Sequence, residues 1–163
     1  MSKQFWIFLA VGLVVVAVVL AGIWFGTKGA HLELTGNILK VRVLALGEKA
    51  SLVEVDFRFT NPSAVPFVVS DVRLKITPPT GEPVEGVAAS RSDIDNVFKG
   101  EKLIGPHFND VLALQDRVPG GKTIDRMTGA RFELPESAID QRKAILLRLE
   151  DVDGTTAELT EKQ

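Results

Sequence analysis

The chain opens with a long uninterrupted run of apolar positions. Residues 5–25 read FWIFLAVGLVVVAVVLAGIWF, which is 21 residues without a charge and without Asn, Gln, Ser or Thr. As an α-helix this run would extend over about 31 Å at about 1.5 Å per residue, and the hydrocarbon core of a bilayer is about 30 Å thick. Trp6 and Trp24 stand near its two ends, where indole rings favour the membrane–water interface, and Lys3 and Lys28 flank it. The pattern predicts a transmembrane helix.

An apolar N-terminal run belongs either to a cleaved signal peptide or to an uncleaved anchor. A signal peptide has an apolar region of about 7–15 residues followed by a small-x-small cleavage site. This run is longer, and Lys28 interrupts the best such spacing, before Ala30. We therefore favour a signal-anchor, with residues 1–28 as tail and anchor and residues 29–163 as the folded domain. A short tail before the anchor and a large domain after it place that domain outside the cytoplasm, although the flanking charges alone do not decide the orientation.

Beyond the anchor, apolar and polar positions alternate with a period of two. In LVEVDFRFT, residues 52–60, Val53, Val55, Phe57 and Phe59 alternate with Glu54, Asp56, Arg58 and Thr60. Such alternation is typical of a strand with one apolar face and one polar face. Weaker alternation predicts further strands at residues 39–46, 72–76, 84–90, 103–118 (broken near Pro106) and 130–134, and a hairpin over 144–159 that turns at Asp153-Gly154.

One segment interrupts the strand pattern. In RSDIDNVFKG, residues 91–100, Ser92 is a candidate cap for a short helix that Gly100 ends, which gives a helical insertion near residues 92–99. PESAIDQRK, residues 135–143, is either a loop or a single helical turn.

Seven or eight short strands with turn signals between them are typical of antiparallel sheets packed face to face. The predicted fold is therefore all-β, an immunoglobulin- or fibronectin-like β-sandwich preceded by one transmembrane helix, with a barrel as the alternative. The Cys–Trp–Cys signature of true immunoglobulin domains is absent from the sequence, so this prediction rests on the strand pattern.

The composition limits the partners and the kinds of chemistry that we expect for the domain. Residues 29–163 hold 17 Lys plus Arg (19 less Lys3 and Lys28) against 21 Asp plus Glu, a formal charge of −4. This balance argues against a nucleic-acid partner, which needs a positive surface. The chain has no cysteine and no tyrosine, and its two histidines are His31 and His107.

Three sequence fragments suggest chemistry, and each is incomplete. His107 lies three residues before Asp110 but has no nucleophile motif beside it. EDVDG, residues 150–154, resembles the start of a calcium loop, but the position that needs glutamate is Lys162. PGGKT, residues 119–123, lacks the first glycine of a phosphate loop. We therefore expect no catalytic, cofactor-binding or metal-binding residues, no cofactor and no enzymatic activity.

The stretch FTNPSAVPF, residues 59–67, predicts a fold-defining turn between two strands. Asn61 can start the turn, while Pro62 and Pro66 donate no backbone hydrogen bond and so protect strand ends from pairing with another chain.

The same stretch carries a family resemblance. An alternating strand, then Asn-Pro-Ser, then Pro66-Phe67 and a strand over residues 72–76, is similar to the late embryogenesis abundant subgroup two family, which overlaps the water stress and hypersensitive response (WHy) domain. RVPGGKT, residues 117–123, resembles a later Pro-Gly turn of that family. The match covers about residues 32–84, and the chain departs from the family pattern over residues 91–110. The resemblance implies a fibronectin-like sandwich that is often membrane-tethered, has no catalytic residues and serves in stress protection, with some relatives suspected of binding lipid.

These observations predict a non-enzymatic, single-pass membrane protein whose β-sandwich is a cell-envelope stress-protection or interaction module. Its partners would be the lipid bilayer, through residues 5–25, and a further protein or a lipid. The alternative is a lipid- or hydrophobic-ligand-binding domain held at the membrane surface. Its cavity would lie between the sheets and be lined by Phe57, Phe59, Phe67 and Phe132.

Overall fold

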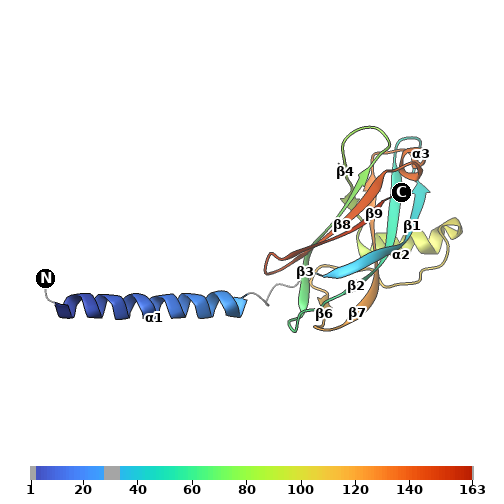
Figure 1. Ribbon diagram of the computed structural model, residues 1–163. Helices are drawn as coiled ribbons and strands as arrows, with labels where there is room; N and C mark the ends of the chain where they lie inside the picture. Colours follow the sequence, from blue (N-terminus) through green and yellow to red (C-terminus); the bar gives the residue numbers. More distant parts are fainter. Residues whose placement is uncertain (1–2, 28–33, 163) are drawn as a thin grey trace. The chain divides into compact units, whose positions relative to one another are not determined.

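The computed structural model describes residues 3–27 and 34–162 and divides into two compact units, Met1–Leu32 and Glu33–Gln163. In the first unit, helix α1 runs from Lys3 to Thr27 (Figure 1), so the predicted helix over residues 5–25 is confirmed. Its window Gln4–Ala21 has a mean hydropathy of 2.6 and is long and apolar enough to cross a membrane.

The predicted anchor residues are only partly described. The Trp6 side chain is 60% exposed within the chain itself. The side chains of Lys3 and Trp24 are not described, and Lys28 lies outside the described residues.

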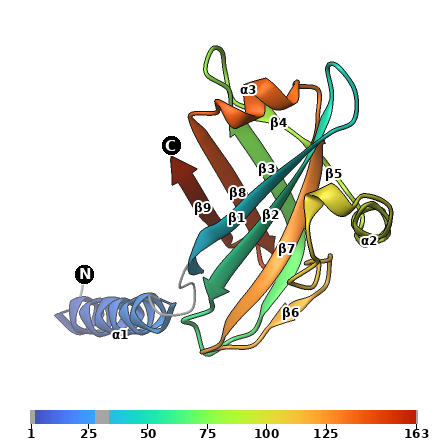
Figure 2. The same cartoon turned by 90° about the vertical axis from the view of Figure 1, so that its right-hand side faces the viewer.

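The second unit is built from antiparallel strands in two sheets (Figures 1 and 2). The first sheet has the order β1-β2-β7-β5, formed by Thr35–Ala45, Ser51–Thr60, Thr123–Phe132 and Val87–Ala88. The second has the order β4-β3-β8-β9, formed by Val84–Glu85, Phe67–Thr77, Ala144–Asp151 and Thr156–Lys162, and the short strand β6, Arg117–Val118, pairs with β3. A mostly β fold with one N-terminal apolar helix is therefore confirmed.

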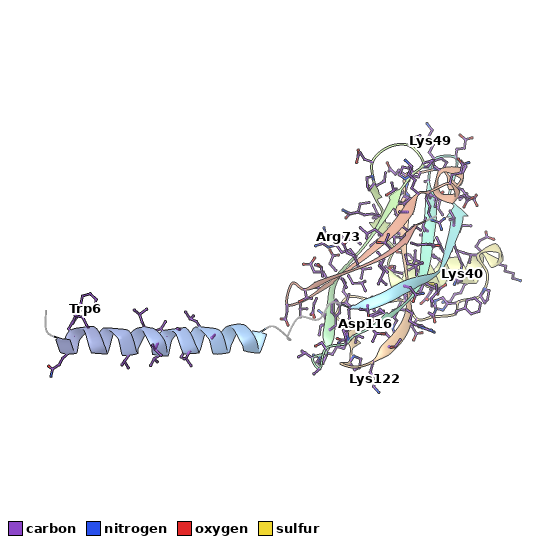
Figure 3. The ribbon with its side chains drawn as sticks, viewed as in Figure 1. Trp6, Lys40, Lys49, Arg73, Asp116 and Lys122 are labelled. Atoms are coloured by element: carbon purple, nitrogen blue, oxygen red, sulfur yellow. The ribbon has the colours of Figure 1, made fainter. Side chains whose placement is uncertain are left out.

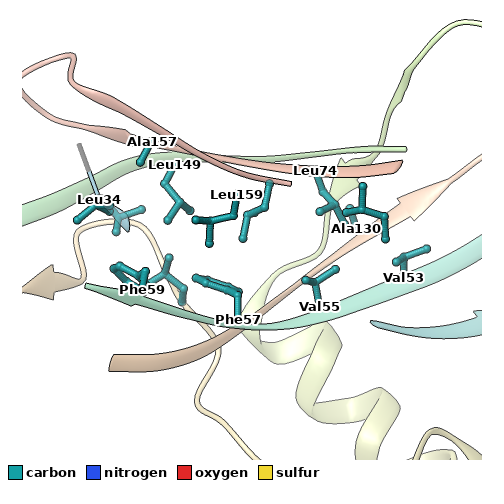
Figure 4. Close-up of a cluster of buried hydrophobic side chains, with 14 of the residues drawn as sticks. Leu34, Val53, Val55, Phe57, Phe59, Leu74, Ala130, Leu149, Ala157 and Leu159 are labelled. Carbon is teal, nitrogen blue, oxygen red and sulfur yellow. The ribbon is translucent and has the colours of Figure 1, made fainter. Parts of the chain in front are cut away.

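The core lies between the two sheets. Figure 4 shows the predicted apolar face of β2, Val53, Val55, Phe57 and Phe59, opposite Leu74, Leu149 and Leu159 of the second sheet. The four β2 side chains are fully buried, and the rings of Phe57 and Phe59 stack with centroids 5.5 Å apart. Burial of each large apolar side chain contributes about 1.5–3 kcal/mol, so the apolar face of β2 makes a large contribution to the stability of the domain.

The four phenylalanines of the predicted ligand cavity belong to this core. Phe57, Phe59, Phe67 and Phe132 are each at most 5% exposed and pack in one cluster of buried side chains. The three cavities described below are lined by other residues.

The turn between β2 and β3 is organised by Asn61, which is 2% exposed. Its Nδ2 donates to the carbonyls of Val65 (2.8 Å) and Val118 (3.1 Å), and its Oδ1 accepts the Ser63 N–H (3.0 Å). Its backbone N–H donates to the Lys122 carbonyl at 2.9 Å. Asn61 thereby joins two turns that are about sixty residues apart in the chain, and Pro62 and Pro66 lie within the first of them.

The two turns also approach closely at Gly120. A Cβ atom added at Gly120 would lie 2.6 Å from the carbonyl oxygens of Ser63 and Ala64. The Pro-Gly turn of residues 119–122 therefore has a packing role against the Asn-Pro turn, and glycine is required there because of space.

Helix α2 spans Arg91–Gly100, close to the predicted insertion, but its cap is Ser90 and not Ser92. The Ser90 hydroxyl accepts the Asp93 N–H, and the Asp93 carboxylate accepts the Ser90 N–H, both at 3.2 Å. The reciprocal bonds form between Ser90 and Asp93, and this capping box makes Ser90 the residue at which the helix begins.

The predicted strand over residues 103–118 is wrong. That segment contains the short 3-10 helix η1, Lys102–Ile104, an isolated bridge between Val111 and Met127, and β6 at its end. Gly105, with φ of +88°, and Pro106 break the extended conformation. The last helix, α3, spans Glu136–Asp140, which agrees with the single helical turn considered for that segment.

Candidate functional site

The segment from α2 to Val111 covers the outer face of the first sheet. Figure 2 shows α2 outside that sheet, next to β7. Ile94 of α2, Val111 and Met127 form a second buried cluster, and Ala89 and Phe98 pack against it. Strand β2 is therefore buried on both faces over most of its length, and the polar face that the alternation places on β2 lies under a cover instead of in water.

Three charged side chains are enclosed beneath this cover: Arg42 of β1 and Glu54 and Asp56 of β2, each at most 6% exposed. Arg42 and Glu54 are direct partners in the β1–β2 register. The Arg42 Nη2 donates to the Asp56 Oδ2, and Asn109 Nδ2 donates to the Asp56 Oδ1 at 2.8 Å. Both oxygens of Asp56 are thus satisfied, one by a charged donor and one by the covering segment. We call Arg42, Glu54 and Asp56 the buried triad.

Aromatic rings close over the triad. The guanidinium carbon of Arg42 lies 5.1 Å from the ring centroid of Phe98 and 5.7 Å from that of Phe108. Lys40, labelled in Figure 3, places its Nζ 5.5 Å from the Phe108 ring. Cation–π attraction at these distances is worth about 0.5–2 kcal/mol. The covering segment is therefore attached to β1 by rings on cations as well as by apolar contacts.

Glu54 is the group that the triad leaves unsatisfied. Its side chain is fully buried, and its carboxylate oxygens find no hydrogen-bond partner among the described residues. The nearest charge is the Arg42 Nη1 at 3.6 Å from Oε2, which is too long for a hydrogen bond. Burial raises the pKa of Glu54 to about 7, against the lowering by Arg42 and with a further raising by Asp56. A proton on Glu54 removes the one excess negative charge of the triad.

A polar cavity of about 350 Å³ opens beside α2. Its ten lining residues are Arg91, Asp95, His107, Asp110, Val111, Leu112, Asp116, Arg117, Ile124 and Arg126. They include no serine, threonine or cysteine that could act as a nucleophile. The cavity's charged side chains are three arginines and three aspartates.

The walls of the polar cavity are fixed by hydrogen bonds. Arg91 Nη2 donates to the Val111 carbonyl (2.8 Å) and to the Asp116 Oδ2 (3.1 Å), and the Ala113 N–H donates to the same carboxylate (2.8 Å). Asp116 is labelled in Figure 3. Because one carboxylate joins α2 to the segment before β6, this wall is held in place before any ligand arrives.

His107 lies in this cavity with a different partner from the one that its sequence position suggests. Its Nε2 is 3.4 Å from the Asp95 Oδ1 of α2, and its ring meets that of Phe98 edge-on at 4.7 Å. Asp110 lines the same cavity without an ion pair to His107. The structure therefore gives His107 the role of attaching residues after η1 to α2.

A second cavity, of about 360 Å³, is mainly apolar and shares Arg91 and Leu112 with the first. Its apolar lining comes from Val72, Ala88, Ala89, Leu112, Ala113 and Leu114. A third, of about 310 Å³, lies at the β1–β2 turn and is lined by Gly47, Lys49, Ala50, Arg131 and Glu133.

The two remaining fragments from the sequence lie in turns. Asp151 accepts the Val68 N–H through Oδ1 at 3.2 Å, and its carbonyl accepts the Gly154 N–H at 2.9 Å in the β8–β9 turn. Gly154 has φ of +81°, as the predicted tight turn requires. Within the described ranges 3–27 and 34–162, there is no group of three or more His, Cys, Asp or Glu that could hold a metal ion.

Sequence reasoning missed the buried triad. A signal was present in the sequence. Glu54 and Asp56 occupy the polar face of the most regularly alternating strand, and a helical segment that contains Phe98 and is followed by Phe108 interrupts the strand pattern later in the chain. A helix inserted into a β-domain has to cover a face, and the most strongly patterned strand is a candidate for the face that it covers.

Compared with protein-family models, with curated proteins and with solved structures, the chain gives no significant match. The family resemblance of residues 32–84 therefore stays a prediction carried by the residues named for it.

Proposed function

We propose that this chain is a non-enzymatic, single-pass membrane protein whose β-domain is a binding module held at the membrane. In this proposal the two sheets form an immunoglobulin- or fibronectin-like sandwich outside the cytoplasm, and the module serves in the cell envelope, in stress protection or in recognition of a partner protein. The stress-protection part rests on the family resemblance alone.

The observation that carries the proposal is helix α1. Its described apolar side chains, such as Val14 and Val18, are 62% and 66% exposed, and none of its 18-residue apolar window is buried within the chain. Removal of apolar surface from water is favourable by about 25 cal/mol per Å², so transfer of this helix from water into a bilayer is strongly favourable. Its length also matches the hydrocarbon thickness of about 30 Å.

The domain supports a binding role in preference to a catalytic one. The polar cavity has acids, guanidinium groups and a histidine but no serine, threonine or cysteine among its lining residues, and its histidine is engaged with Asp95. Two cavities of similar size share Arg91 and Leu112 beside the covering segment. This region is where we place recognition.

Alkaline carbonate extraction of membranes from cells that express the full chain tests the anchor. The wild type is expected in the membrane pellet. The double variant Val14→Asp, Val18→Asp should move to the supernatant, because each carboxylate at the centre of a membrane helix costs about 2.5–3.5 kcal/mol. The matched control Val152→Asp, on the exposed β8–β9 turn, should stay in the pellet. A wild-type chain that is released by carbonate would remove the anchor from the proposal.

The second candidate function is binding of a lipid or another hydrophobic ligand, and the apolar cavity between β5 and Leu114 favours it. In this candidate function the ligand would lie beside the covering segment and not among the four core phenylalanines. Native mass spectrometry of the full chain released from detergent should show an added lipid mass, and Ala113→Phe, which fills the cavity, should lose it. A bare mass for the wild type would exclude this candidate.

A further inference from the structure

We propose that the polar cavity is a binding site for a small, singly charged oxyanion, of the carboxylate or phosphodiester type, and that Arg117 and Arg126 are its ligands. The site goes beyond the role of a tethered module, and its chemistry does not depend on the tether.

The charges around the cavity leave two guanidinium groups uncommitted. Arg91 is paired with Asp116, and His107 with Asp95. Among the residues that the structure describes, neither Arg117 nor Arg126 has a carboxylate within 4 Å. The domain has a formal charge of −4, and these two cations lie at one cavity without an acidic partner among the ion pairs of the described residues.

Arg126 is held at the edge of β7 where the cavity opens. On the side of β7 away from β2, the backbone of Met127 is hydrogen-bonded to Asp110 and Leu112, and the backbone of Gly129 is hydrogen-bonded to Ala89. The strand around Arg126 is therefore bonded to residues that line the cavity or lie beside it. The Arg126 Nη1 donates to the Asp125 carbonyl at 2.9 Å. One guanidinium nitrogen is thereby fixed at the strand edge, and the other N–H groups of this five-donor fork remain for a ligand.

Arg117 reaches the same cavity from the other sheet. It lies on β6, which pairs with β3 at Val68, and its neighbour Val118 is fully buried while Arg117 is exposed. The two guanidinium groups thus come from strands that belong to different sheets. Because Arg91 bonds to Val111 and Asp116 in the lining of the same cavity, part of its wall is preorganised, which reduces the entropy lost on binding.

The lining also selects the charge of the ligand. With His107 counted as neutral, as in the formal charge of the domain, the three arginines and three aspartates of the lining balance, and Arg117 and Arg126 are the two cations outside its ion pairs. These two guanidinium groups suit a singly charged oxyanion, and the carboxylates of Asp95 and Asp110 in the same lining disfavour a dianion. Planar guanidinium groups match the two oxygens of a carboxylate or phosphodiester by paired N–H donors, which distinguishes such ligands from chloride.

The test uses the full chain in neutral detergent and follows the arginine Nε–Hε resonances by NMR. Acetate is the soluble probe and replaces chloride at constant ionic strength. Saturable shifts of Arg117 and Arg126 are expected. Arg117→Gln and Arg126→Gln should each weaken acetate binding about tenfold or more, since a hydrogen bond to a charged group is lost. The control Arg131→Gln removes an exposed cation from the same strand β7 and should change affinity less than about twofold.

A second experiment, in lipid nanodiscs, distinguishes a lipid phosphodiester from a soluble anion as the ligand. If the site takes a lipid phosphodiester, acetate binding should weaken in phosphatidylcholine nanodiscs relative to the neutral detergent, because this lipid supplies a phosphodiester without adding a net surface charge. If it takes a soluble anion, the acetate affinity should be the same in both. Equal shifts with acetate and with chloride, or an acetate affinity unchanged in both arginine variants whose circular dichroism is native, would overturn the site.

Discussion

Replacement of Glu54 by glutamine tests the electrostatics of the buried triad. Burial raises the pKa of Glu54 from 4.5 to about 7, a difference of about 2.5 pH units, and each unit corresponds to about 1.36 kcal/mol. The folded state holds the Glu54 proton more tightly than the unfolded state. The stability that this proton contributes is therefore complete below pH 4.5 and is lost as the pH rises through about 7, a loss of about 3 kcal/mol.

Glu54→Gln keeps the shape of the protonated side chain and cannot ionise. The variant should match the wild type at pH 4.5 and exceed it by up to about 3 kcal/mol in free energy of unfolding at pH 8. Urea denaturation of the full chain in neutral detergent, followed by far-UV circular dichroism, measures this difference. Tryptophan fluorescence would not report on the domain, because Trp6 and Trp24 both lie in α1.

The control for this experiment is Glu133→Gln, which neutralises an exposed carboxylate at the β1–β2 turn cavity. Its effect should be within about 0.5 kcal/mol at both pH values. A stability difference between Glu54→Gln and wild type that is the same at pH 4.5 and pH 8 would refute a raised pKa for Glu54.

Three further substitutions probe the turns and the helix cap by the same denaturation assay. Asn61→Ala removes three side-chain hydrogen bonds at a buried site and should cost about 2–4 kcal/mol; a loss below 1 kcal/mol would contradict its role. Gly120→Ala should cost about 1–3 kcal/mol because its Cβ would meet two carbonyl oxygens, whereas Gly47→Ala, with nothing within 4 Å, should be near neutral. Ser90→Ala should destabilise by about 1 kcal/mol as a lost cap; if Ser92→Ala costs more, the cap is misassigned.

The features that sequence predicts well are those set by local periodicity. The hydropathy of residues 5–25 and the alternation of β2 are each sufficient to define an element, because the solvent or the core imposes the pattern residue by residue. The Asn-Pro turn is also predictable from its own residues. Its contacts with Val118 and Lys122 are not, since they join turns distant in the chain.

The candidate site depends on tertiary contacts that leave little local signal. Glu54 and Asp56 have the sequence pattern of solvated strand residues, and only the cover of α2 and the residues after it makes them buried. The segment after α2 has apolar residues, Ile104 and Val111 among them, that are buried without forming a strand, which is why alternation there predicted the wrong structure. The cavity arginines come from three separate elements, and their convergence follows from the fold.

Membrane attachment with the β-domain outside the cytoplasm is the central claim, and cysteine labelling tests it most directly. The chain has no cysteine, so a single introduced thiol is the only target for a membrane-impermeant maleimide. The cells are first freed of any cell wall or outer membrane, with the membrane around the cytoplasm left intact. Ser137→Cys, exposed on α3, should then be labelled at once, and Ser2→Cys should be labelled only after permeabilisation. Labelling of Ser2→Cys in intact cells, with Ser137→Cys protected until permeabilisation, would contradict the account.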